Sequence, residues 1–191
     1  PLDPVTARLD DRSYYRCEET RLLYMRRFLP PTISYNERYF FEEYRRQYGR
    51  TYLEDFRQIK GMGKKRLRRI QRKLPSRRLP SRHAENGATR SAIRPGRWKR
   101  ETGGPTLLDV GCAYGPFLRA AEEAGFNVSG IDVSTEAIEY VRSELGLPAR
   151  ATTLEVLDPV ESFGVSRFDV VSMWYVIEHL PNVEELLTRV R

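Results

Sequence analysis

The sequence has little cysteine and no long apolar run. Cys17 and Cys112 are its only two cysteines, which is too few for a disulfide framework and favours a reducing compartment such as the cytoplasm. No apolar stretch approaches the roughly 18 residues of a membrane-spanning helix, so no insertion into a membrane is expected. The chain starts at Pro1 without a basic or apolar leader, so the sequence predicts no signal peptide and a start that has been cut or processed.

Acidic residues are nearly absent from one stretch. Residues 64–100 hold 15 basic residues and one acidic residue (+14), whereas residues 1–63 hold 12 and 10 (+2) and residues 101–191 hold 6 and 15 (−9). Such a stretch can attract phosphates, but Trp98 is its only aromatic residue, so base-stacking platforms are scarce. We therefore expect a solvated, flexible linker over residues 75–104, and we do not expect nucleic acid as the partner.

The scarcity of cysteine also bears on metal binding. Cys17 is followed by Glu18, Glu19 and Thr20, so no second thiol stands within reach along the chain. A single thiol cannot build a structural zinc site. The sequence therefore predicts no bound metal at this position.

Residues 1–74 are predicted to form a helical N-terminal region. Four aromatic residues follow one another at helical spacing and share one face of the predicted helices: Phe41, Tyr44, Tyr48 and Tyr52. Gly49 is expected to divide this stretch into two helices, and Gly61-Met62-Gly63 to separate it from a short basic helix over residues 64–73. The aromatic face either packs on the following domain or covers a substrate pocket as a lid.

The pattern changes at residue 105 to alternating strand and helix signals. Strands are expected at residues 106–110, 127–131, 150–153 and 168–173, and helices at residues 116–124, 134–145 and from 182 onward. Alternating strands and helices indicate an α/β domain, residues 105–191, with a parallel sheet covered on both faces.

A glycine-rich turn and two acidic residues carry the chemistry of this domain. The first strand ends in Asp109-Val110-Gly111-Cys112-Ala113-Tyr114-Gly115, and the second strand ends at Asp132. Glycines at this place allow a tight turn and let a ligand approach the backbone. Asp132 stands where a carboxylate can accept the two hydroxyls of a ribose.

Two kinds of nucleotide-like ligand compete for this turn. The dinucleotide fingerprint G-x-G-x-x-G is not matched, because Ala113 replaces its second glycine and Pro116 its third. A pyrophosphate would also meet the like charge of Asp109, whereas the cationic amino-acid tail of S-adenosylmethionine would be attracted to it. The turn therefore favours S-adenosylmethionine, with a nucleotide-dependent oxidoreductase as one alternative.

Three successive motifs make the resemblance specific. They are Leu107–Gly115, Gly130–Ser134 (Gly-Ile-Asp-Val-Ser) and Phe168–Pro181, which contains Trp174-Tyr175-Val176-Ile177-Glu178-His179. Together they resemble class I S-adenosylmethionine-dependent methyltransferases, in particular the bacterial branch of ubiquinone-biosynthesis O-methyltransferases and polysaccharide-cluster methyltransferases. The resemblance implies a Rossmann-like sheet with strand order 3-2-1-4 in this chain, a methyl-transfer activity, and a small-molecule acceptor.

The resemblance also implies roles for individual residues. The backbone from Gly111 to Gly115 and Asp109 would hold the methionine tail, Asp132 the ribose, and Val133, Thr153 and Leu154 the adenine, while Trp174 would wall the sulfonium. Ala113 replaces a common family glycine, with little damage expected if its φ is negative. The full set of expected cofactor-binding residues is Asp109, Gly111, Cys112, Ala113, Tyr114, Gly115, Asp132, Val133, Thr153, Leu154 and Trp174.

No catalytic residue is identified by these motifs. His179 is either a general base beside the methyl donor or a residue that caps and packs the helix after the fourth strand, and the second interpretation is favoured. Glu178 and His179 are two potential ligands of a divalent ion, but no third ligand accompanies them.

The family's sheet has seven strands, so a chain that ends after four is expected to be a fragment. A methyltransferase, a non-catalytic cofactor-binding or nucleic-acid-associated relative, and an oxidoreductase remain the three functional hypotheses, in that order.

Overall fold

The computed structural model describes residues 5–8, 12–27, 39–75, 103–180 and 183–190. These residues belong to two compact units, Pro1–Ser34 and Tyr35–Arg191. The predicted linker over residues 75–104 lies almost wholly outside the described ranges, so its flexibility stays a prediction. No helix within the described ranges is long and apolar enough to cross a membrane.

The first unit is a small antiparallel sheet. Its strands are β1 (Val5–Arg8), β2 (Arg12–Arg16) and β3 (Leu23–Arg27), in the order β1-β2-β3. The prediction of a helical region from residue 1 is therefore wrong for this unit. The strands β2 and β3 do not alternate between apolar and polar residues, so they show no period of two in the sequence.

Cys17 begins the tight turn between β2 and β3. Its N–H donates to the carbonyl of Leu22 at 2.9 Å, and the N–H of Thr20 approaches its sulfur at 3.5 Å. Arg21 in the same turn adopts a left-handed conformation with φ +60°. The cysteine is thus placed by the hairpin itself.

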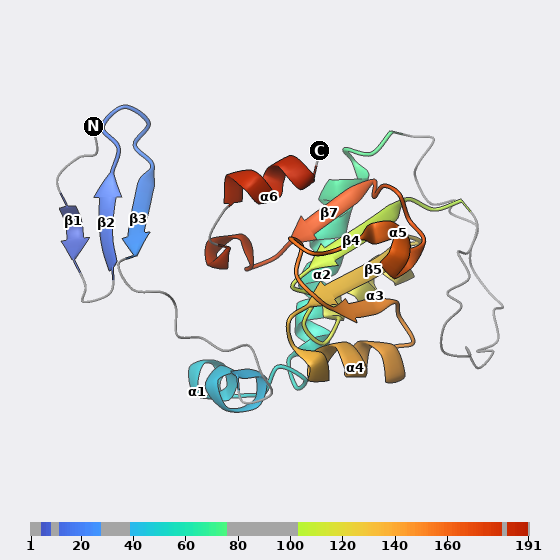
Figure 1. Cartoon of the computed structure of the whole chain (residues 1–191). Coiled ribbons are helices and arrows are strands. Elements are labelled where there is room, and N and C mark those ends of the chain that lie inside the picture. The colour runs from blue at the N-terminus through green and yellow to red at the C-terminus, as the bar shows by residue number, and fades with distance from the viewer. Residues whose placement is uncertain (1–4, 9–11, 28–38, 76–102, 181–182, 191) are drawn as a thin grey trace. The chain divides into compact units, whose positions relative to one another are not determined.

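The second unit contains a four-stranded parallel sheet. Its strands are β4 (Thr106–Val110), β5 (Asn127–Asp132), β6 (Ala149–Ala151) and β7 (Val170–Met173), in the order β6-β5-β4-β7. Figure 1 shows β4 between β5 and β7. This is the predicted order 3-2-1-4, and the Rossmann-like prediction for this part of the chain is confirmed.

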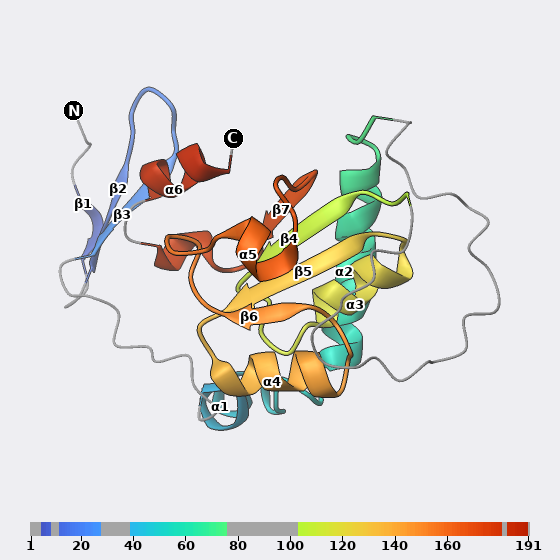
Figure 2. The same ribbon diagram turned by 45° about the vertical axis from the view of Figure 1, so that its right-hand side comes forward.

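Helices cover the two faces of this sheet (Figures 1 and 2). One face packs with α3 (Pro116–Glu123) and α4 (Thr135–Ser143), and the other with α5 (Pro159–Phe163) and α6 (Val183–Arg189). Ser134 and Asp158 cap α4 and α5 through side-chain oxygens that accept backbone N–H groups. A helix over residues 134–145 was expected, whereas α5 was not, because its five residues form barely more than one turn.

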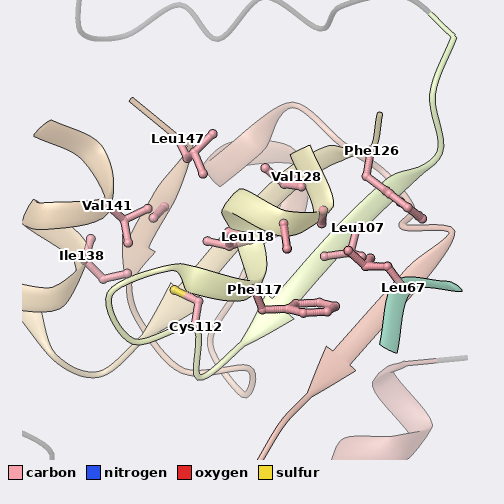
Figure 3. Close-up of a cluster of buried hydrophobic side chains, with 13 residues drawn as sticks. Leu67, Leu107, Cys112, Phe117, Leu118, Phe126, Val128, Ile138, Val141 and Leu147 are labelled. Carbon is pink, nitrogen blue, oxygen red and sulfur yellow. The ribbon is translucent and has the colours of Figure 1, made fainter. Parts of the chain in front are cut away.

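Adjacent residues of β4 are buried on opposite sides of the sheet. Leu107 packs with Leu118, Val128 and Val141 in the cluster of Figure 3, whereas Leu108 packs with the α5 and α6 side. Side chains of a strand alternate between faces, so burial of both leucines requires layers on both faces. The core thereby fixes the strand that carries Asp109.

The long helix α2 (Phe56–Gln71) packs against α3, as Figure 2 shows. The predicted break at Gly61–Gly63 is wrong, because both glycines lie inside this continuous helix. Gly63 faces α3 so closely that a Cβ there would lie 3.1 Å from the Phe117 ring. Lys60 and Lys64 pair with Glu123 of α3 at 2.8 and 3.0 Å. Close approach, rather than chain flexibility, accounts for this glycine.

A π-helix turn, η1 (Tyr39–Glu43), and helix α1 (Tyr44–Tyr48) precede α2. Gly49 ends α1 with φ +77°, which confirms the predicted division at this glycine. The predicted helical N-terminal region is thus present from Tyr39 to Gln71.

Candidate cofactor site

The predicted site residues meet at the carboxyl end of the parallel sheet. Asp109 of β4 lies in register with Gly130 of β5 and Ser172 of β7, and Asp132 ends β5. Open α/β sheets bind their ligands at this edge. The two acids and the glycine-rich turn are therefore brought together as the sequence predicted.

Asp109 is a buried acid in an unusual electrostatic setting. Only 2% of the residue is exposed, and burial raises the pKa of its carboxyl to about 7. The Ser172 hydroxyl donates to Oδ1 at 2.6 Å and opposes this rise in pKa. The charge of the Asp132 carboxylate raises the pKa further, and the charge of Arg66 lowers it. A cationic ligand group would remove the cost of ionising Asp109.

The glycine-rich turn has three residues in left-handed conformations. They are Gly111 (φ +70°), Ala113 (φ +48°) and Gly115 (φ +77°). A Cβ on Gly111 would lie 2.2 Å from the Val176 side chain, so this position requires glycine. The condition under which Ala113 would cause little damage, a negative φ, is not met, and its methyl group costs about 1 kcal/mol of strain. The family glycine at this place is explained by the conformation.

Asp132 organises the same turn from β5. Its Oδ2 accepts from the N–H of Ala113 at 2.8 Å, and its Oδ1 accepts from the N–H of Ser134 at 2.9 Å. Burial raises the pKa of Asp132, while these backbone donors oppose the rise. A carboxylate has about four lone-pair sites, so Asp132 can still accept from a ligand hydroxyl. Val133 beside it is 58% exposed and offers an apolar surface next to this carboxylate.

Arg66 of α2, which was not among the predicted site residues, lies against Trp174. Its guanidinium carbon lies 4.2 Å from the centre of the Trp174 ring and 5.4 Å from that of Tyr175. We call Arg66, Trp174 and Tyr175 the arginine–aromatic stack. The Trp174 ring also meets Phe117 edge-to-face, with centroids 5.4 Å apart. Within the described chain, the buried Nε1 of Trp174 has no hydrogen-bond acceptor. An incoming ligand oxygen would satisfy this donor.

Cys112 and Tyr114 serve the turn through packing. Cys112 is buried in the core cluster of Figure 3, and burial raises the pKa of its thiol well above its usual value. The Tyr114 ring packs edge-to-face on Phe40 at 5.1 Å and on Tyr140 at 5.3 Å. The side chains of these two residues therefore support the turn, and their backbone is what remains for a ligand.

Aromatic residues of the N-terminal helical region cover this turn. Tyr52 packs against Phe40 with centroids 5.3 Å apart, and lies 6.1 Å from the Tyr114 ring centre. Burial raises the pKa of the Tyr52 hydroxyl, and the charges of Asp109 and Asp132 raise it further. Tyr52 therefore lies near both acids. These contacts fit the interpretation of the aromatic face as a packing surface, and its role as a lid over a substrate pocket stays a prediction.

Two predicted adenine contacts differ in their surroundings. Thr153 is exposed just after β6, whereas Leu154 is buried in the core on the α5 side of the sheet. Thr153 is open to a ligand, and Leu154 can contribute its backbone.

His179 lies half-buried in the 3-10 helix η3 (Ile177–His179), where its backbone N–H donates to the carbonyl of Val176 at 2.8 Å. Among the residues that the structure describes, no three His, Cys, Asp or Glu residues form a group that could hold a metal ion. The favoured interpretation of His179, a residue that packs the segment after β7, stays a prediction.

Comparison with known proteins identifies the family of this arrangement. The model of the family described as "Methyltransferase domain" matches residues 60–191, well over half of the chain. The chain belongs to this methyltransferase-domain family. The matched residues include α2 from residue 60 onward, with Arg66, and the whole parallel sheet, so the family extends beyond the three motifs recognised in the sequence.

Individual relatives match part of the chain. The chain is 35% identical over 85 residues to the ubiquinone biosynthesis O-methyltransferase of Actinobacillus pleuropneumoniae serotype 7, and the match covers 41% of this chain and 36% of the relative. It is 38% identical over 89 residues to the enzyme of that name from Paramagnetospirillum magneticum, covering 44% and 34%. The match thus spans only about a third of each of these curated relatives.

Solved structures also align with part of the chain. The plantazolicin methyltransferase BpumL in complex with SAH aligns over 45% of this chain and 33% of its own, at 24% identity and a TM-score of 0.39. A TehB-like SAM-dependent methyltransferase from Corynebacterium glutamicum aligns over 46% and 47%, at 22% identity and a TM-score of 0.39.

Proposed function

We propose that this methyltransferase domain binds S-adenosylmethionine and belongs to an enzyme that transfers its methyl group to a small-molecule acceptor. The family match and the paired acids at the carboxyl end of the sheet support this proposal. The observation that carries it is Asp132, which ends β5 beside the glycine-rich turn and keeps lone pairs free for a ribose.

The methionine tail is assigned to two sides of the site. Its ammonium group fits Asp109, because a buried carboxylate is stabilised by a neighbouring cation. Its carboxylate fits Arg66, and the unpaired indole N–H of Trp174 offers it a second donor. The pattern of one acid and one guanidinium matches a zwitterionic amino-acid group.

The nucleoside part is assigned to the β5–β6 side. The ribose hydroxyls would donate to Asp132, and the adenine would lie on Val133 near Thr153 and the backbone of Leu154. The backbone from Gly111 to Gly115, with Cys112, Ala113 and Tyr114, would approach the ligand without intervening side chains.

The reaction requires little covalent chemistry from the protein's own residues. The bound sulfonium supplies an activated methyl group, so the domain's residues contribute positioning and exclusion of water. Tyr52 and Phe40, which cover the glycine-rich turn, are suited to exclude water. A pyrophosphate cofactor is disfavoured, since Asp109 would repel it.

Calorimetry with S-adenosylhomocysteine tests the assignment. Asp132→Asn replaces a charged acceptor of two ribose hydroxyls by a neutral amide, so the affinity is expected to fall by about 2–4 kcal/mol. Asp158→Asn is the matched control, because asparagine keeps the cap of α5 and lies outside the site. Equal affinity of Asp132→Asn and the parent chain, or tight NAD binding by the parent chain, would overturn the proposal.

A further inference from the structure

Tyr175 has an uncommon backbone conformation for its residue type. Its φ is +58°, in the left-handed region, and 73% of the residue is exposed. A bulky residue in this region is an outlier that costs free energy, and such strain persists where the surrounding structure imposes it. None of the three apolar clusters of the described residues includes Tyr175. The strain therefore serves neither the core nor the burial of the ring.

The residues on either side of Tyr175 indicate how its strained backbone directs the side chain. Trp174 packs inward against Phe117, and the Val176 side chain packs against Gly111 of the glycine-rich turn. The left-handed turn between them directs Tyr175 outward at the carboxyl end of β7. Arg66 lies 5.4 Å from the centre of the ring and supports it by a cation–π interaction. An exposed ring is thus held beside the proposed cofactor site.

We propose that Tyr175 is a specificity-determining residue of methyl transfer, whose ring binds the flat face of a ring-shaped acceptor. The inference rests on the proposed function, because it takes the adjacent site as that of the methyl donor. In-line transfer requires an acceptor held in one orientation, and a fixed aromatic face provides this without a charged contact. An aromatic ring and the C–H face of a pyranose share the required chemistry: both present a flat, uncharged surface that stacks.

Three probes with neighbouring hydroxyls distinguish an aromatic acceptor from a pyranose acceptor. Catechol offers an aromatic ring, methyl mannoside offers a pyranose ring, and propanediol offers no ring. Ligand-observed NMR on the full chain saturated with S-adenosylhomocysteine is expected to detect catechol or methyl mannoside, and not propanediol. Whichever ring compound binds identifies the source of the flat face. Equal binding of propanediol, or binding of neither ring compound, overturns the proposal.

Substitutions at Tyr175 test the residue itself. Tyr175→Asn and Tyr175→Gly remove the ring and tolerate φ +58°. Each is expected to weaken binding of the ring probe roughly tenfold and to raise the melting temperature by about 2–4 °C through relief of strain. Tyr175→Phe, which restores the ring, is expected to recover binding relative to Tyr175→Asn. A structural role would instead lower the melting temperature in the ring-less variants.

Arg21→Gly is the matched control, because Arg21 shares the left-handed conformation (φ +60°) in the N-terminal hairpin. It is expected to leave binding of the ring probe unchanged. Unchanged probe binding in Tyr175→Asn, with S-adenosylhomocysteine still bound, would refute the role of Tyr175 alone. Failure of the parent chain to bind S-adenosylhomocysteine would instead refute the proposed function.

Discussion

The two sides of the candidate site are held in different ways. The turn side, which is Asp109–Gly115 with Asp132, is held by backbone hydrogen bonds and left-handed residues. The arginine–aromatic stack is held by side-chain packing between α2 and the end of β7. The turn side comes from one continuous β-α-β segment, and Asp132 ties its ends together. The stack joins residues more than one hundred positions apart. A local motif can therefore build half of the site, while the other half depends on how α2 docks.

Disturbing the docking of α2 should have the largest effect. Gly63→Leu places a side chain where even a Cβ would lie 3.1 Å from the Phe117 ring, whereas Gly61 has open space around it. Gly63→Leu is therefore expected to destabilise the domain by about 1–3 kcal/mol, by overpacking. Gly61→Leu is the matched control and should be neutral or stabilising, because leucine favours the helix. Urea unfolding measures both; similar destabilisation by the two variants would mean that α2 does not dock on α3.

Removing the charge of the stack should affect the cofactor next. Arg66→Gln deletes the cation assigned to the methionine carboxylate, so the affinity for S-adenosylhomocysteine is expected to fall by about 1.5–3 kcal/mol. Lys65→Gln, at an exposed neighbouring position of α2, controls for a general loss of positive charge. If the two variants bind with equal affinity in calorimetry, Arg66 has no place in the site.

A pH titration examines the turn side. Asp109 has a raised pKa of about 7 in the folded, ligand-free protein, so it must lose its proton to attract the ammonium group of the ligand. The affinity for S-adenosylhomocysteine is therefore expected to rise about tenfold between pH 6 and pH 8. Asp109→Asn should abolish this dependence, and Ser172→Ala should move its midpoint to higher pH, because the Ser172 hydrogen bond lowers the pKa.

The same group has an opposite effect on stability. The raised pKa means that the folded state holds the proton more tightly than the unfolded chain, so this contribution is complete below about pH 4 and is lost as the pH rises to about 7. Stability and affinity should therefore respond to pH in opposite directions across this window. A comparison of Asp109→Asn with the parent chain by urea unfolding isolates the contribution; identical pH profiles would contradict it.

The smallest expected effect concerns the strain in the turn. Ala113→Gly removes a Cβ from a residue with φ +48° and should stabilise the domain by about 0.5–1 kcal/mol. Ala120→Gly in α3, where φ is not positive, should destabilise instead. Thermal unfolding distinguishes the two; destabilisation by Ala113→Gly would show that its methyl contacts outweigh the strain.

The sheet and the turn side were largely predictable from sequence. The helix after the turn and the meeting of Asp109 with Asp132 follow from local patterns and from the rule for parallel connections. The strand order was implied by the family resemblance and not by these patterns. Local signals fail elsewhere for identifiable reasons. The strands β2 and β3 do not alternate between apolar and polar residues. Gly63, a helix breaker by propensity, is retained inside α2 because α3 approaches it closely.

The sequence by itself determined the parallel sheet, the left-handed glycines at both ends of the turn, and the carboxylates at its edge, because these depend on neighbours along the chain. Only the tertiary structure decided that Arg66, one of many cations in a basic stretch, lies over Trp174, and that Tyr175 stands exposed beside it. Leu67 and Ile70 mark one face of α2 by their helical spacing, but the local sequence does not say which ring Arg66 meets beside that face. That contact arises from which face of α2 packs on α3, and that packing is set by residues distant in the chain.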